Sequence, residues 1–191
     1  IKAYPLHPVV TLLLGPISKQ RFGQNERSIF TFLNSGESFG FLSFINDDKT
    51  KPKTVYTPDL LFDYLSNNLE PSILASNLGH AWSEASEAIR RAETLDDAES
   101  IKLAKSITLI DLFGKNISLN ASKEVLATCL NSKTNITKKL QELEKKKVVI
   151  FRKFKKAYAL FSGSDIDLDD LTKINKQKID KNNTTNFSLK K

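Results

Sequence analysis

The sequence is poor in several residue types, and each shortage limits what the chain can be. It contains a single cysteine, Cys129, and so cannot form an intrachain disulfide, which indicates a reducing cytoplasmic setting. It contains no methionine, and we therefore expect the sequence to be a fragment of a longer protein. No apolar run approaches the roughly 20 residues that a membrane-spanning helix needs, so we expect no membrane contact.

Positive charge is unevenly distributed along the chain. The net charge is +7, but residues 1–100 hold 9 Lys/Arg and 13 Asp/Glu, whereas residues 101–162 hold 14 and 4. A concentrated block of cations raises the local concentration of anions and is typical of a nucleic-acid-binding face. A solvated lysine-rich surface has the same composition. Charge alone leaves both interpretations open.

Helical patterns dominate the start of the chain. Residues 9–14 predict a short buried helix, and residues 17–34 predict a second one with an aromatic and aliphatic side. Residues 35–58 have the composition of a loop, rich in Gly, Ser, Asp and Lys. We expect the aromatic run FGFLSFI within this loop to enter the hydrophobic core.

Two prolines predict the starts of further helices. Thr57 is the expected N-cap of a helix that begins at Pro58, and Pro71 is the expected first residue of another helix over 71–93. The polar stretch TLDDAES follows and is the best candidate for a domain boundary. We therefore expect a helical subdomain over residues 1–98.

The order of elements changes after this boundary. Three amphipathic helices are followed by two short β-branched and aromatic runs, VVIFRKF and AYALFS, with a two-residue turn expected at Lys155-Lys156. Three helices and a hairpin within about 60 residues are typical of a winged helix-turn-helix domain. The expected fold is mainly α, with this winged-helix domain at 99–171 and a flexible polar tail at 172–191.

The third of these helices and the hairpin carry the candidate contacts with nucleic acid. In helix-turn-helix docking the second helix of the pair lies in the major groove, and here that helix would cover residues 134–146. The candidate nucleic-acid-binding residues are Thr137, Lys138, Gln141 and Lys145 on the helix, and Arg152, Lys153, Lys155 and Lys156 on the hairpin. The alternative is a winged helix that packs against its own chain or a partner protein.

Several stretches of the sequence resemble a known family. They are YPLHPVVTLLLGPISKQRFGQNERSIFTFL, YTPDLLFDYL, LAKSITLIDLFG and VVIFRKFKKAYALFSGSDIDLDDL. Together they are similar to the C-terminal region, lid plus winged helix, of the large bacterial P-loop AAA/STAND-like ATPases found in phage-defence loci. The resemblance implies that a nucleotide core precedes this region in a parent protein, which would bind ATP and Mg.

The resemblance also implies a role for two arginines. Arg27, in QNERS, would be a sensor or finger-type arginine near the γ-phosphate, and Arg21 is a weaker candidate. Such arginines stabilise the charge that develops in the transition state of phosphoryl transfer. By composition alone, both suit a structural Arg–Glu network, and His7 between two prolines suits a structural hydrogen bond.

The chain departs from such ATPases because it has no G-x-x-x-x-G-K-[ST] motif, and Gly114-Lys115 is followed by Asn116. No His, Cys or carboxylate lies at metal-ligand spacing from His7. We therefore expect no catalytic residue, metal or cofactor in this piece. The favoured function is a non-catalytic fragment of an ATPase, whose winged helix binds DNA or RNA and whose helical part contacts the nucleotide core. The alternatives are a protein-interaction or homo-oligomerisation module and a free-standing transcription regulator.

Overall fold

The computed structural model describes residues 3–20, 32–47, 54–130 and 135–162 of the chain. The described residues up to Phe161 form one compact unit. Its described part is mainly helical and carries a small two-stranded antiparallel hairpin, which confirms the mainly-α prediction. Most of the helix predicted over 17–34 lies outside the described residues, as does the tail predicted at 172–191.

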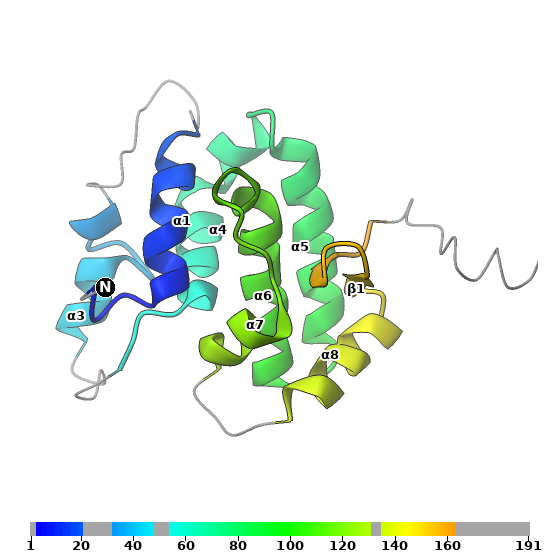
Figure 1. Cartoon of the computed structure of the whole chain (residues 1–191). Coiled ribbons are helices and arrows are strands. Elements are labelled where there is room, and N and C mark those ends of the chain that lie inside the picture. The colour runs from blue at the N-terminus through cyan, green and yellow to red at the C-terminus, as the bar shows by residue number, and fades with distance from the viewer. Residues whose placement is uncertain (1–2, 21–31, 48–53, 131–134, 163–191) are drawn as a thin grey trace, which may run out of the picture. The chain divides into compact units, whose positions relative to one another are not determined.

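The N-terminal part contains α1 (Pro8–Ser18), α3 (Phe41–Asn46), α4 (Pro58–Leu74) and α5 (Gly79–Glu93). Pro8 opens α1, where its missing N–H leaves no hydrogen bond unmade. The imidazole Nδ1 of His7 accepts a hydrogen bond from the backbone N–H of Val9 and so caps the helix. Figure 1 shows α1, α4 and α5 arranged around α6 (Ala98–Phe113).

Two predictions for this part are wrong in detail. The segment expected to be a loop contains α3, in which Phe41 and Phe44 face the core and Leu42 and Ile45 are exposed. The prediction that FGFLSFI enters the core holds only for Phe41 and Phe44, which lie three apart on a helical turn and are partly buried, whereas Phe39 is 42% exposed. The first helix also runs beyond residue 14, because Ile17 continues its buried side past Pro16.

Pro71 does not begin a helix, as the sequence had predicted, but lies inside α4. A proline within a helix removes one hydrogen bond and crowds the preceding turn. Here the buried side chains of Leu69 and Ile73 lie on either side of it and keep the last turn of α4 on the core. Tertiary packing thus outweighs the local preference, and the chain reverses between α4 and α5 instead.

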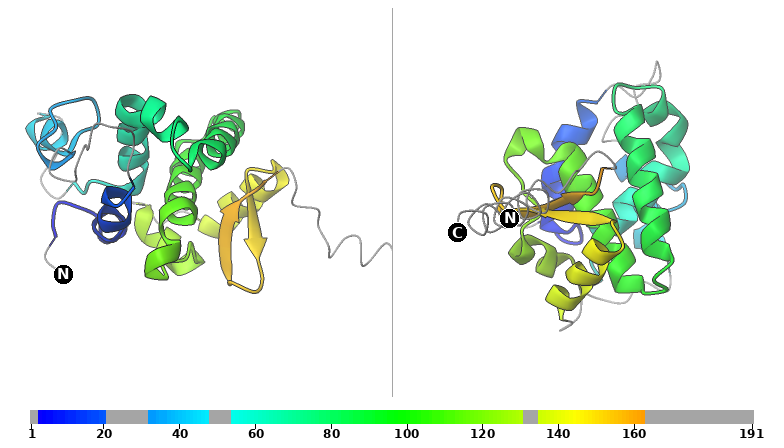
Figure 2. Two further views of the ribbon diagram at one scale, coloured as in Figure 1. Left: turned by 90° about the horizontal axis from the view of Figure 1, so that it is seen from above. Right: turned by 90° about the vertical axis from the view of Figure 1, so that its right-hand side faces the viewer.

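The C-terminal part contains α6, a 3₁₀ turn η1 (Lys115–Ile117), α7 (Lys123–Cys129), α8 (Ile136–Lys145) and the strands β1 (Val149–Arg152) and β2 (Ala157–Leu160). Figure 2 shows the hairpin projecting beyond the helices. The strands pair in the register Val149–Leu160 to Arg152–Ala157. The turn at the tip therefore covers residues 153–156, and the predicted two-residue turn at Lys155-Lys156 is wrong.

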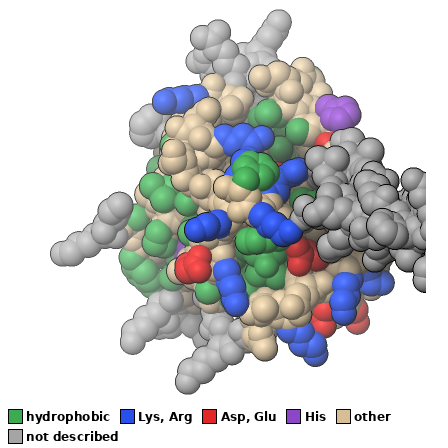
Figure 3. Space-filling view, turned by 45° about the vertical axis from the view of Figure 1, so that its right-hand side comes forward, with side chains coloured by type: hydrophobic (Ala, Val, Ile, Leu, Met, Phe, Trp, Pro, Cys, Tyr) green, Lys and Arg blue, Asp and Glu red, His purple; other side chains and the backbone are tan. Residues whose placement is uncertain are grey.

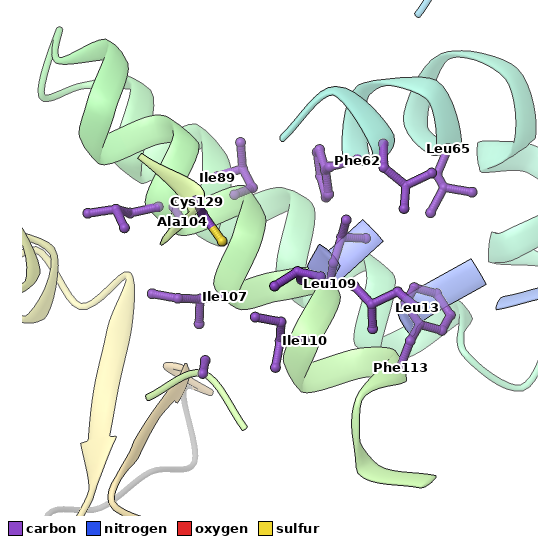
Figure 4. Packing of buried hydrophobic residues seen from close by; sticks show 14 of the residues in the cluster. Leu13, Phe62, Leu65, Ile89, Ala104, Ile107, Leu109, Ile110, Phe113 and Cys129 are labelled. Carbon is purple, nitrogen blue, oxygen red and sulfur yellow. The ribbon is translucent and has the colours of Figure 1, made fainter. Parts of the chain in front are cut away.

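Helix α6 lies at the centre of the unit and packs against the helices on both sides of it. Figure 4 shows Leu109 of α6 near Phe62 of α4 and Leu13 of α1, with Ile107 directed toward the hairpin side. One cluster of buried hydrophobic residues runs from Val9 to Val149. The boundary predicted at residue 98 therefore does not correspond to a break in the hydrophobic core.

None of the helices in the described part of the chain combines the length and the apolar character that crossing a membrane requires.

Candidate nucleic-acid interface

Helix α8 presents one apolar and one polar side. Asn135 caps it, with its side-chain oxygen 3.3 Å from the backbone nitrogen of Lys138. Leu140 and Leu143 are buried against the core. The four predicted contact residues on this helix all lie on the exposed side: Thr137, Lys138, Gln141 and Lys145. The sequence thus placed this surface correctly on the helix.

Lys139 is the exception among the lysines of α8, because it points toward the start of α6. Its Nζ lies 2.6 Å from Asp97 Oδ2 and 3.8 Å from Glu99 Oε2. Asp97 is also the N-cap of α6 and accepts a hydrogen bond from the Ser100 backbone N–H at 3.1 Å. Burial opposes the charged carboxylate, but the hydrogen bonds from Lys139 and Ser100 outweigh it and lower the pKa of Asp97. This ion pair fixes α8 on α6.

Two variants separate the two roles of Asp97. Asp97→Ala removes both cap and ion pair and should reduce the free energy of unfolding by about 1–2 kcal/mol. Asp97→Asn keeps an oxygen that can cap the helix, so it should lose less than about 1 kcal/mol, the range of a solvent-accessible ion pair. Urea unfolding at neutral pH measures both values. Equal losses in the two variants would contradict the capping role.

The hairpin tip is formed by backbone hydrogen bonds and carries the remaining predicted contacts. The N–H groups of Lys155 and Lys156 donate to the carbonyl oxygens of Arg152 and Lys153, at 3.0 and 3.2 Å. Lys156 has a φ of 49°, a left-handed conformation that reverses the chain into β2. Lys153, Lys155 and Lys156 are exposed, and Arg152 is half-buried.

A third segment, which the sequence did not reveal, joins the hairpin. The backbone N–H of Tyr158 donates to the carbonyl oxygen of Ala121 at 2.9 Å, so residue 121 pairs with β2 as an isolated bridge. Beneath the hairpin, a small depression is lined by Lys115, Asn120 and Lys155. Lys115 thus adds a cation beside the tip. The place of Lys115, directly after Gly114 at the end of a helix, could have indicated that it is exposed. The pairing of residue 121 with residue 158 has no local signature in the sequence.

These elements produce a basic surface on one side of the unit. Figure 3 shows Lys and Arg side chains around exposed hydrophobic side chains on the face that includes the hairpin, with fewer Asp and Glu side chains among them. Among the described residues, Lys145, Lys146, Lys155 and Lys156 form no ion pair. Lys138 lies 4.0 Å from Glu142, a distance at which an exposed pair contributes little. The surface therefore keeps most of its positive charge.

The other candidate residues have different outcomes. Arg21 and Arg27 lie outside the described residues. His7 has the structural role that the sequence indicated: its Nε2 lies 2.8 Å from the carbonyl oxygen of Thr128, so it ties the start of α1 to α7. Because Nδ1 accepts from Val9, Nε2 must be the nitrogen that carries the proton.

His7 should make stability dependent on pH. Burial lowers its pKa, against the opposing effects of the Thr128 hydrogen bond and the Asp59 charge. The unfolded chain therefore takes up this proton at a higher pH than the folded one, and the free energy of unfolding falls as pH drops below about 6.5. His7→Asn keeps a capping oxygen without titrating. It should be less stable than the wild type by about 1 kcal/mol at about pH 8, with a smaller difference at about pH 5.5.

Urea unfolding of both proteins at the two pH values provides the measurement. Parallel pH dependence in wild type and His7→Asn would show that another group titrates. The comparison isolates this histidine because every other titratable group is shared by the two proteins.

The only cysteine of the chain is unsuited to nucleophilic chemistry. Cys129 is buried under α6, and burial raises the pKa of its thiol to about 11. It therefore stays protonated at neutral pH, whereas the reactive form is the thiolate. In the described part of the chain, no group of three or more His, Cys, Asp or Glu side chains converges as metal ligands would.

Comparisons of the chain with protein-family models, with curated proteins and with solved structures gave no significant match.

Proposed function

We propose that the basic surface of α8 and the hairpin binds the phosphate backbone of a nucleic acid. The observation that carries the proposal is the exposure of Lys138, Lys145, Lys155 and Lys156 on two elements that are consecutive in the chain. Lysines that only keep a surface solvated would not need to be grouped on two neighbouring elements in this way. Of the acidic groups near these lysines, Asp97 pairs with Lys139, and Glu142 lies 4.0 Å from Lys138, a distance at which an exposed pair contributes little.

We further propose that α6, α7, α8 and the hairpin form a winged helix. The bridge from Ala121 to Tyr158 supports this proposal, because a short strand between the first two helices that pairs with the wing suits this architecture. In that arrangement the exposed side of α8 would enter the major groove, and Thr137 and Gln141 could reach base edges. The hairpin tip would lie on the adjacent backbone.

A titration of labelled duplex DNA followed by fluorescence anisotropy tests the proposal. If four to six lysines contact phosphates, log K should fall with log salt with a slope of roughly −4 to −5. Measuring at about 50 and 200 mM salt is enough to determine it. Negligible binding at low salt, together with self-association of the chain, would favour the protein-interaction alternative.

The resemblance to P-loop ATPases extends the proposal to a parent protein. We propose that the chain is the nucleic-acid-binding, non-catalytic part of such an ATPase, with its helical part against the nucleotide core. Support for this step comes from sequence resemblance alone. In the intact protein, Arg27→Ala should lower ATP turnover without changing the unfolding temperature. Wild-type turnover would refute the role of this arginine.

A further inference from the structure

The hairpin tip exposes an aromatic ring among lysines. Phe154 is 79% exposed, the highest value among the large hydrophobic side chains of the described residues. Its turn is closed by backbone hydrogen bonds, and its ring is not part of the hydrophobic core. The fold therefore does not require an aromatic side chain at this position.

The surroundings of the ring indicate the chemistry of its partner. Lys155 Nζ lies 5.6 Å from the centre of the Phe154 ring, and Lys153 and Lys156 share the same turn. Farther along β1, Phe151 is 40% exposed and its ring lies 5.0 Å from that of Tyr158. Aromatic rings interspersed with cations are the combination that holds a nucleic-acid strand, because the cations attract phosphates and the rings stack on bases.

Duplex and single-stranded nucleic acids differ in what they offer such a ring. In a continuous duplex every base is stacked on its neighbours, and inserting a side chain between them separates a base step at a free-energy cost. An unpaired base has a free face that every base type can offer. The Phe154 ring therefore gains the most stacking free energy from a nucleic-acid strand whose bases are already unpaired.

We propose that Phe154 stacks on an unpaired base, so that the hairpin tip prefers single-stranded nucleic acid to a continuous duplex. The inference rests on the proposed function, because the neighbouring lysines must bind phosphates before the ring can reach a base. It adds the class of ligand, which charge alone does not specify. It also assigns separate tasks to neighbouring residues of one turn: Lys155 and Lys156 supply attraction, and Phe154 supplies discrimination.

The test compares Phe154→Ala and Phe154→Trp with the wild type, all as the full chain. The probes are a fluorescein-labelled DNA strand of about 20 nucleotides and the duplex of the same sequence, a length that exceeds the site size of a typical single-strand-binding module. Phe154→Ala should bind the single strand about tenfold more weakly and the duplex less than about twofold more weakly. Its salt slope should not change, because no charge is removed. Phe154→Trp should keep wild-type affinity.

Two controls accompany these variants. Leu12→Ala removes a side chain that is 46% exposed on α1, away from the hairpin in Figure 1, and should change neither affinity. In Phe154→Trp, the fluorescence of the new indole should be quenched by the single strand and not by the duplex. The natural Trp82 is 0% exposed and should not respond to either probe.

The outcomes separate this inference from the proposed function. If Phe154→Ala binds the single strand as the wild type does, or weakens equally on both probes, stacking on an unpaired base is wrong. Salt-sensitive binding through the lysines would then still support the proposed function. If the wild type binds neither probe in a salt-sensitive manner, the proposed function and this inference both fail.

Discussion

The double variant Lys155→Glu/Lys156→Glu is expected to bind nucleic acid about 100-fold or more weakly than the wild type. Each charge-assisted hydrogen bond to phosphate contributes roughly 1.5–3 kcal/mol, and the reversed charges add repulsion. The slope of log K against log salt should become shallower by about 2, because two phosphates are no longer neutralised by a lysine. Anisotropy titrations at low and moderate salt give both quantities.

A matched variant distinguishes the effect of the position of the lysines on binding from the effect of the net charge of the protein. Lys19→Glu/Arg90→Glu changes the net charge by the same amount at two exposed cations, one at the end of α1 and one on α5. It should lose only the long-range attraction that salt screens, and its salt slope should stay close to that of the wild type. If both double variants weaken binding equally, net charge and not the hairpin tip attracts the ligand.

Leu109→Ala is expected to have the largest effect on stability. Leu109 is 0% exposed and lies at the centre of the unit, where α6 meets α1 and α4. Truncation of a buried leucine leaves a cavity and reduces the free energy of unfolding by about 2–5 kcal/mol. Urea unfolding followed by circular dichroism measures the loss, and Leu12→Ala on the exposed side of α1 should change stability by less than about 0.5 kcal/mol.

The same experiment tests whether one core or two hold the chain together. Trp82 on α5 reports on the N-terminal part through its fluorescence, whereas circular dichroism reports on all helices. With one continuous core, both signals should change at the same urea concentration in wild type and Leu109→Ala. Two separated transitions would instead favour independent folding units on either side of residue 98.

Local patterns predicted the parts of this structure that depend on local chemistry. The exposed side of α8 followed from its apolar spacing, and the start of α4 followed from Thr57 and Pro58, although the Thr57 side chain makes no capping hydrogen bond. Pro71 misled the prediction because two buried neighbours outweigh the preference of proline for a helix start. The four-residue turn was missed because Lys156 adopts a left-handed conformation, which glycine or asparagine would indicate in a sequence but lysine does not.

Long-range contacts of the candidate site had no equivalent signal. Apolar spacing placed Lys138 on the exposed side of α8 and left Lys139 out of the predicted contacts, but it gave no sign that Lys139 would pair with Asp97, which lies 42 residues earlier in the chain. The exposure of Phe154 was equally hidden, since strand alternation assigns it to a face and not to the tip of a turn.

The connection between α5 and the hairpin has a mechanical consequence. The guanidinium of Arg91 donates two hydrogen bonds, at 3.2 and 3.1 Å, to the carbonyl oxygen of Lys147, the residue at which the chain turns from α8 into β1. These two hydrogen bonds connect the base of the hairpin to α5, a helix 56 residues earlier in the chain. If the hairpin binds a nucleic acid as proposed, a force on its tip would have a route to α5 through these two hydrogen bonds, in addition to the route along the chain through α8.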